Sequence, residues 1–220
     1  DPDNFRYKNK LVAELAWVIR SAPSMSNSSG SGLYSTLDRT WCHEQFEFHK
    51  NWLDYLDEQP EEIEKYFQQS KTLLLGKRFE AFVQFWFEES PFFELLAYNV
   101  QLSNNGRTIG EIDFIVKDNR SDETLHIEAA CKFYLSNKNS QQWKHWVGPN
   151  GNDNLQLKMN KLDKQLAICS TIEGKEFLSK NAINQPISCL FMKGYFFHHY
   201  RILTQSKAPS SSASNYNVGW

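Results

Sequence analysis

Three consecutive segments of alternating polarity, joined by short turns, constrain most strongly what this chain can fold into. They cover residues 93–102, 108–117 and 124–134. Alternation with a period of two predicts β-strands, and the sequence Asn104-Asn105-Gly106 supplies residues that tolerate positive φ in a hairpin turn. The segments therefore predict a three-stranded meander.

Helical spacing precedes and follows this meander. Apolar residues recur at helical intervals within 72–89, and again from about 153 to 170, where Asn152 or Asp153 is expected as the N-cap. Residues 187–203 predict one or two further strands. The element order is α-β-β-β-α-β, which predicts the α/β class with a mixed sheet.

The N-terminal third predicts helices that lie outside this core. Residues 8–22 have the stripe of a helix, residues 23–40 are rich in Ser and Gly and predict a flexible loop, and Trp41–Gln69 predicts two short helices separated at Pro60. We expect an N-terminal helical extension over residues 1–70, a core over 71–205 and a flexible tail over 206–220.

Composition excludes several classes of protein. Hydrophobic residues make up 40% of the 220 residues, and no apolar run approaches the ~18 residues that cross a bilayer. The four cysteines are scattered singly, which indicates a reducing, cytoplasmic compartment. With 24 Lys and Arg against 26 Asp and Glu, the global charge does not favour a polyanion, so any nucleic-acid site must be a local patch.

Charged residues interrupt two neighbouring strands of the meander. Alternation predicts that Glu111, Asp113 and Ile115 share one face, opposite Ile112, Phe114 and Val116, and that one face of the next strand carries His126, Glu128, Ala130 and Lys132. An Asp, a Glu and a Lys then converge on one side of the sheet. Carboxylate oxygens suit Mg²⁺ or Mn²⁺, and a nearby lysine can orient or activate a water molecule.

This arrangement resembles the PD-(D/E)xK nuclease superfamily, whose restriction-endonuclease-like core is α-β-β-β-α-β. Four blocks, LGKRFEAFVQFW (75–86), GEIDFIV (110–116), IEAACKFYL (127–135) and WVGPNGNDNLQLKMNKLDKQL (146–166), are together similar to a bacterial family of unknown function assigned to that superfamily. The likeness covers roughly residues 72–205. The recurrence of four blocks in order is fairly specific, whereas the bare superfamily motif is weak.

The resemblance implies roles for particular residues. Asp113 and Glu128 would be the metal-binding acids, Lys132 the lysine of the catalytic triad and Glu80 an auxiliary acid on the preceding helix. The implied cofactor is Mg²⁺ or Mn²⁺ and the implied partner is nucleic acid.

The helix that follows the meander adds a substrate-binding role. Lys158, Lys161 and Gln165 lie beside its apolar stripe. In the resemblance the corresponding helix offers polar residues to the substrate, and the candidates are Lys161 and Gln165. We expect both residues to contact a phosphate, where lysine acts as a point charge.

One position departs from the superfamily pattern. An acid is expected two residues before the lysine, and Ala130 stands there; Glu128 is four residues before Lys132, about 13 Å away along a regular strand. Either a β-bulge shortens this separation or the site is altered. Two hypotheses follow: a metal-dependent phosphodiesterase, or a non-catalytic nuclease-fold domain that binds nucleic acid or a protein partner. The sequence distinguishes neither DNA from RNA nor one oligomeric state from another.

Overall fold

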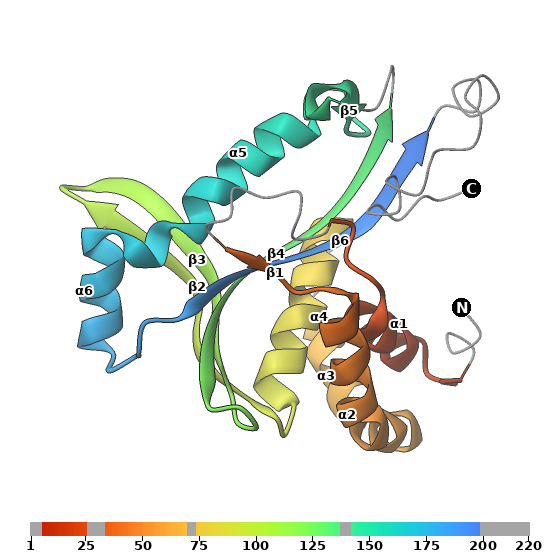
Figure 1. Cartoon of the computed structure of the whole chain (residues 1–220). Helices are drawn as coiled ribbons and strands as arrows, with labels where there is room; N and C mark the ends of the chain where they lie inside the picture. Colours follow the sequence, from red (N-terminus) through yellow and green to blue (C-terminus); the bar gives the residue numbers. More distant parts are fainter. Residues whose placement is uncertain (1–5, 26–33, 70–73, 137–141, 199–220) are drawn as a thin grey trace.

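The described part of the chain folds into a mixed six-stranded sheet with helices on both faces (Figure 1). The structure is a computed structural model that describes residues 6–25, 34–69, 74–136 and 142–198. It confirms the α/β class and the helical character of the N-terminal region.

The central strands form the predicted meander. Strands β2 (Phe93–Asn104), β3 (Arg107–Asp118) and β4 (Glu123–Ser136) are paired antiparallel in sequence order. Asn105 and Gly106 make the first turn with φ values of 48° and 77°, as the Asn-Asn-Gly sequence predicts.

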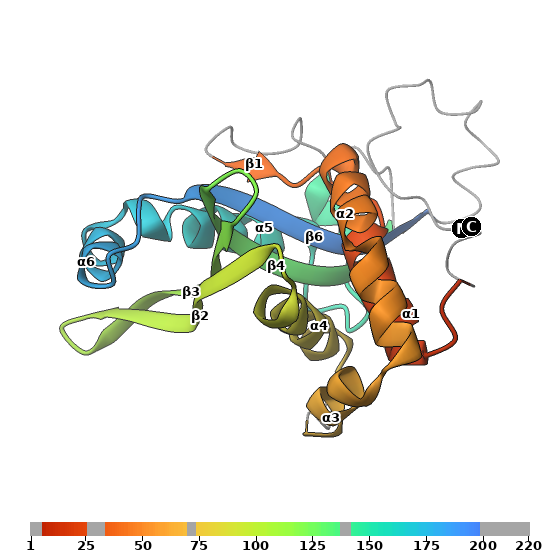
Figure 2. The same ribbon diagram turned by 90° about the horizontal axis from the view of Figure 1, so that it is seen from below.

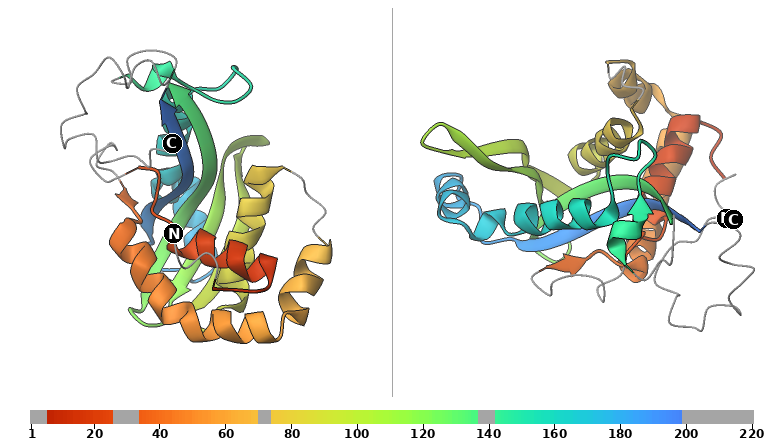
Figure 3. Two further views of the ribbon diagram at one scale, coloured as in Figure 1. Left: turned by 90° about the vertical axis from the view of Figure 1, so that its right-hand side faces the viewer. Right: turned by 90° about the horizontal axis from the view of Figure 1, so that it is seen from above.

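Parallel pairing completes the sheet in the order β1-β6-β4-β3-β2. Strand β6 (Ile187–His198) runs parallel to β4, and the short β1 (Ser35–Thr36) runs parallel to β6. A further short strand, β5 (Trp146–Val147), pairs with the end of β4. Strands β4 and β6 lie side by side through the middle of the molecule (Figure 3).

One face of the sheet is covered by four N-terminal helices: α1 (Lys10–Arg20), α2 (Arg39–Glu58), α3 (Glu61–Gln69) and α4 (Leu75–Glu89). The predicted stripe of α4 is confirmed, because Phe79, Phe82, Val83 and Trp86 are buried against strands β3, β4 and β6 in the largest core cluster. Burial of each such side chain contributes about 1.5–3 kcal/mol, which anchors α4 firmly beside the sheet.

The opposite face carries the C-terminal helices (Figure 2). Helix α5 (Leu155–Leu166) buries Leu155, Met159, Leu162 and Leu166, the stripe that the sequence predicts. A 3₁₀ turn, η4 (Ile168–Ser170), leads into α6 (Ile172–Lys180). Helix α5 therefore runs across the sheet face to which Glu128 and Lys132 are expected to point.

Several local expectations were wrong. Helix α2 has 20 residues and is not short. The N-cap of α5 is Asn154, whose side chain accepts the Leu157 N–H at 3.0 Å, and neither Asn152 nor Asp153 has this role. Helix α6 escaped prediction because only Gly174 and Leu178 are buried on it, which is too short a stripe to recognise.

Some predictions lie wholly or partly outside the described residues. These are the flexible tail over 206–220 and the middle of the Ser- and Gly-rich segment 23–40. Residues 199–203, expected to continue the last strand, are also outside, and β6 as described is one strand. Among the described residues, no helix is long and apolar enough to cross a lipid bilayer.

Candidate functional site

The candidate site lies where strands β3 and β4 stop pairing. Their ladder runs from Asp118↔Glu123 to Phe114↔Ile127 and ends one residue before Asp113 and Glu128 would face each other. The side chain of Asp113 takes the place of the next backbone acceptor, because its Oδ2 accepts the Ala129 N–H at 3.1 Å. The carboxylate of Asp113 is thereby held between the two strands by the fold itself.

The neighbouring strand is irregular at the same level. Asn99 in β2 has a φ of 51°, and it is skipped in a ladder that pairs Tyr98 with Phe114 and Val100 with Ile112. Asn tolerates this left-handed conformation better than most residues, yet it is uncommon within a strand. The distortion therefore coincides with the position of Asp113.

The predicted strict alternation along β3 was wrong. Ile112 packs in the same core cluster as Ile115, against η4 and α6, whereas Phe114 and Val116 pack toward the N-terminal helices. The face of β3 that packs against η4 and α6 is therefore carried by an even-numbered residue before Asp113 and by an odd-numbered residue after it. This segment is not a regular strand.

Asp113, which is half-buried, and Glu128, which is fully buried, form a carboxyl pair. Burial raises the pKa of Asp113 from 3.8 to about 7, with a further rise from the negative charge of Glu128 and an opposing effect of the Ala129 N–H. Burial likewise raises the pKa of Glu128 from 4.5 to about 7. Two carboxyls that both titrate near neutrality are poised either to share a proton or to bind a cation.

Glu128 has one satisfied and one unsatisfied oxygen. The residue is 0% exposed, and its Oε1 lies 3.2 Å from Nε2 of the fully buried His126. Its Oε2 is buried and has no hydrogen-bond partner among the residues that the structure describes. A buried polar atom without a partner is costly, so an unpaired oxygen at this position points to a ligand, a proton or a water.

A small polar cavity of about 160 Å³ opens in front of this pair. Residues from β2, β3, β4, α4 and α5 line it: Lys77, Glu80, Tyr98, Asn99, Glu111, Asp113, Phe114, Ala129, Lys158, Lys161 and Gln165. The cavity thus brings together four of the predicted site residues, Asp113, Glu80, Lys161 and Gln165. Glu128 lies behind the lining residues, fully buried.

Lys158 supplies the positive charge next to the carboxyl pair. Burial and the nearby Lys132 and Lys161 lower the pKa of this half-buried lysine, whereas Asp113 and Glu128 act to raise it. The sequence identified Lys158 only as one of several lysines beside the apolar stripe of its helix. Nothing in a helical period indicates which of them turns to the sheet.

Lys132 lies apart from the cavity. Its Nζ donates to Oδ2 of Asp153 at 3.3 Å, and both side chains are partly exposed. Of the two alternatives that the sequence left open, the bulge between Glu128 and Lys132 is absent, because β4 pairs with β6 in unbroken register from Leu125↔Ile187 to Ser136↔His198. The two residues are therefore separated as in a regular strand, and a triad role for Lys132 stays a prediction.

Glu80 is at the edge of the cavity. One of its carboxylate oxygens accepts from Nζ of Lys77 at 2.6 Å, and its negative charge contributes to the raised pKa of Asp113. The charge of Glu80 is therefore paired with that of Lys77 and also acts on Asp113. This arrangement agrees with an auxiliary role and does not require a direct one.

The donor set fits a hard divalent cation. Among residues 6–25, 34–69, 74–136 and 142–198, no group of three or more His, Cys, Asp or Glu side chains is arranged to hold a metal ion. Mg²⁺, however, is commonly held by only one or two carboxylates together with waters and substrate phosphates. Asp113 and Glu128, with the unpartnered Oε2, are a donor set of that kind.

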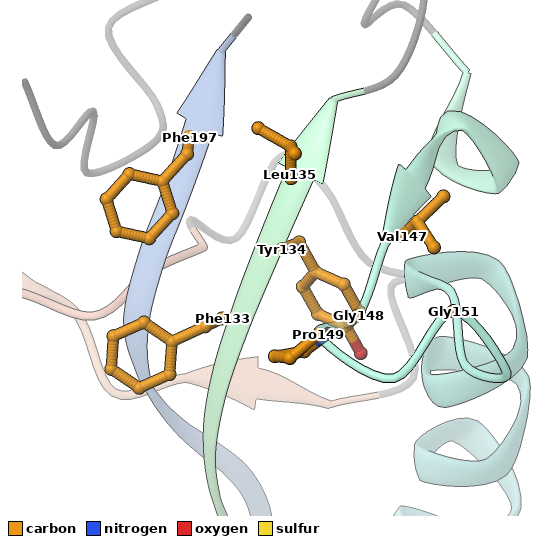
Figure 4. A pocket seen from close by; sticks show the side chains of 8 residues that line it. All are labelled: Phe133, Tyr134, Leu135, Val147, Gly148, Pro149, Gly151 and Phe197. Carbon is orange, nitrogen blue, oxygen red and sulfur yellow. The ribbon is translucent and has the colours of Figure 1, made fainter.

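A second cavity, of about 430 Å³, has a different character (Figure 4). It lies against the ends of β4 and β6 and is lined by Phe133, Tyr134, Leu135, Val147, Gly148, Pro149, Gly151 and Phe197. None of the predicted site residues lines it. The larger cavity is thus mainly apolar, whereas the predicted site residues gather at the smaller one.

Fold and site together define a mixed α/β domain with a half-buried and a fully buried carboxyl between two separating strands and a lysine from a facing helix. The chain matches the family model described as a domain of unknown function, DUF1853, over residues 13–220, and it belongs to that family. No curated protein and no solved structure matches the chain.

Proposed function

We propose that this protein is a metal-dependent phosphodiesterase that acts on nucleic acid, as the resemblance to the PD-(D/E)xK superfamily implies. The observation that carries the proposal is the pair of the half-buried Asp113 and the fully buried Glu128, with an unpartnered oxygen, beside Lys158 at a polar cavity. A purely structural role would leave this cluster unexplained, because enclosing two carboxyls, one of them fully buried, costs stability.

Three residues would have separate roles in phosphodiester cleavage. Asp113 and Glu128 would hold Mg²⁺ or Mn²⁺. When bound, such an ion polarises a phosphoryl oxygen and lowers the pKa of a coordinated water. Lys158 adds a positive charge that stabilises the negative charge developing on the phosphate.

The surroundings of the cavity suit a phosphate backbone. Lys161 and Gln165 line the polar cavity, and a shallow neighbouring pocket adds Lys164 from the same helix. These lysines form a local basic strip on a chain whose formal net charge is −2. Such a local basic strip can bind the phosphates of a nucleic acid even though the net charge of the chain does not attract a polyanion.

The alternative is a non-catalytic nuclease-fold domain that binds nucleic acid or a protein partner. Ala130 favours it, since this residue is 6% exposed and packs against α5 where the superfamily pattern expects an acid. The bond between Lys132 and Asp153 favours it as well. Under this alternative the basic strip would bind without cleaving.

Calorimetric titration of Mn²⁺ tests the proposal without assuming a substrate. We expect the wild type to bind Mn²⁺ and the Asp113→Ala variant not to bind it. Asp122→Asn is the matched control, because the side chain of Asp122 is 83% exposed and pairs only with Lys117 at the far end of the hairpin. The titration is repeated with a short DNA duplex present, since substrate phosphates can complete the coordination shell.

Cleavage assays then separate the two functions. Labelled single- and double-stranded DNA and RNA are incubated with Mg²⁺ or Mn²⁺ and the wild type, Lys158→Met or Lys132→Met. We expect cleavage by the wild type, a loss of two orders of magnitude or so in Lys158→Met, and a smaller loss in Lys132→Met. Nucleic-acid binding with no cleavage under either metal would establish the non-catalytic alternative.

A further inference from the structure

Two histidines, His49 and His126, are 0% exposed, and they have different surroundings. His49 is enclosed among helices, with Nδ1 2.6 Å from the Gln45 carbonyl and Nε2 2.7 Å from the Ser90 hydroxyl. Its partners have no connection to the polar cavity. His126 instead lies directly behind the candidate site.

His126 links strand β6 to the carboxylate of Glu128. It precedes Glu128 by two residues on the same face of β4, and Nε2 lies 3.2 Å from Oε1 of that carboxylate. Its Nδ1 lies 3.2 Å from the hydroxyl of Ser188, which is the residue paired with His126 in the parallel β4–β6 ladder. Three side chains thus form a chain of contacts that ends at the site.

The direction of these bonds follows from the chemistry of the groups. A carboxylate can only accept, so Nε2 of His126 must donate to Oε1, and Nδ1 of the neutral ring then accepts from the Ser188 hydroxyl. Oε1 is occupied by this bond. The unpartnered Oε2 is therefore the oxygen of Glu128 that remains available to a ligand.

We propose that Ser188 and His126 are positioning residues that orient the Glu128 carboxylate so that Oε2 is presented to a divalent cation. The inference rests on the proposed function, because it assumes that Glu128 binds the ion. Ligating carboxylates are commonly held by hydrogen bonds from residues behind them, and loss of such a partner costs about 10- to 100-fold in metal affinity.

A merely space-filling role for His126 does not account for the geometry. An apolar side chain would fill the core between β4 and α5 without burying two more polar nitrogens. The fold instead buries an imidazole and a carboxylate in one row with the half-buried hydroxyl of Ser188, and it leaves one oxygen of that row unpaired among the described residues.

The test is Mn²⁺ titration into the full chain and its variants. We expect His126→Phe, which removes both ring nitrogens, to weaken binding about 10- to 100-fold. His126→Gln retains an amide N–H near the position of Nε2 and should recover most of the affinity. His49→Gln is the control, since it perturbs an equally buried histidine, and we expect it to lower the melting temperature but not the Mn²⁺ affinity.

Ser188→Ala keeps the experiment decisive if His126→Phe does not fold. This variant removes one hydroxyl and leaves the ring in place, so the chain should fold while its Mn²⁺ affinity falls. With binding in the wild type, unchanged affinity in Ser188→Ala, and in His126→Phe where that variant folds, would overturn the positioning role and leave the proposed function intact. Absence of Mn²⁺ binding in the wild type, with or without a DNA duplex, would overturn both.

Discussion

Replacing Asp113 by Asn should make the protein more stable at neutral and alkaline pH, at the expense of its proposed metal site. The amide is nearly isosteric with the carboxylate, and its oxygen can still accept the Ala129 N–H. Its nitrogen adds a donor beside Glu128, whose Oε2 has no partner. The variant thus removes a charge from the site and keeps a donor beside Glu128 at every pH, whereas the Asp113 carboxyl donates only when it is protonated.

The magnitude follows from the pKa of Asp113. Its folded-state pKa of about 7 lies above the ordinary 3.8, so the folded state binds the proton more tightly. Protonation of Asp113 therefore stabilises the folded state, and this stabilisation is fully present below pH 3.8 and is lost as the pH rises to about 7. At about 1.4 kcal/mol per pH unit, ionisation of Asp113 costs the wild type about 2 kcal/mol at pH 5 and about 4 kcal/mol at pH 8.

The Asn variant escapes this cost, so its advantage over the wild type should grow by about 2–3 kcal/mol between pH 5 and pH 8. Urea unfolding at both pH values measures it, with Asp122→Asn as a control whose exposed carboxylate should give a pH-independent difference under about 1 kcal/mol. If the difference between Asp113→Asn and the wild type varies by less than about 0.5 kcal/mol over this range, Asp113 does not titrate as a buried acid and the reasoning fails.

Two further predictions concern the scaffold. Gly194→Ala should lower the free energy of unfolding by at least about 2 kcal/mol. The reason is that φ is +124° and a Cβ at this position would lie 1.7 Å from the carbonyl oxygen of Lys132. Denaturant unfolding measures the loss, and a neutral result would contradict the close approach of β4 and β6. Lys193→Met should stabilise the protein by on the order of 1 kcal/mol at pH 7, and more as the pH falls. The reason is that burial lowers the pKa of this fully buried lysine, which donates to the Ser21 carbonyl and to Sγ of Cys42. Thermal melts of the variant and the wild type at several pH values measure the difference in stability. A stability gain of the variant that shrinks toward low pH would show that Lys193 is charged in the folded state.

The sequence by itself determined the types and order of the longer core elements, although not the short strands β1 and β5 or helix α6. Period-two alternation predicted β2, β3 and β4, and the stripes of α4 and α5 predicted two helices, because both periods depend only on local backbone geometry. The Asn-Gly turn followed for the same reason. The sequence also singled out Asp113 and Glu128, since acids within apolar strands cost free energy unless they are paired, hydrogen-bonded or bound to a metal.

Only the tertiary structure decided which groups meet at the candidate site. The break in the β3–β4 ladder admits the Asp113 carboxylate, the unbroken β4–β6 register keeps Lys132 away from Glu128, and the packing of α5 turns Lys158 toward the acids. Each of these contacts joins residues that are distant in the sequence. The distances between such residues depend on how helix and strand layers pack, and no local period contains that information.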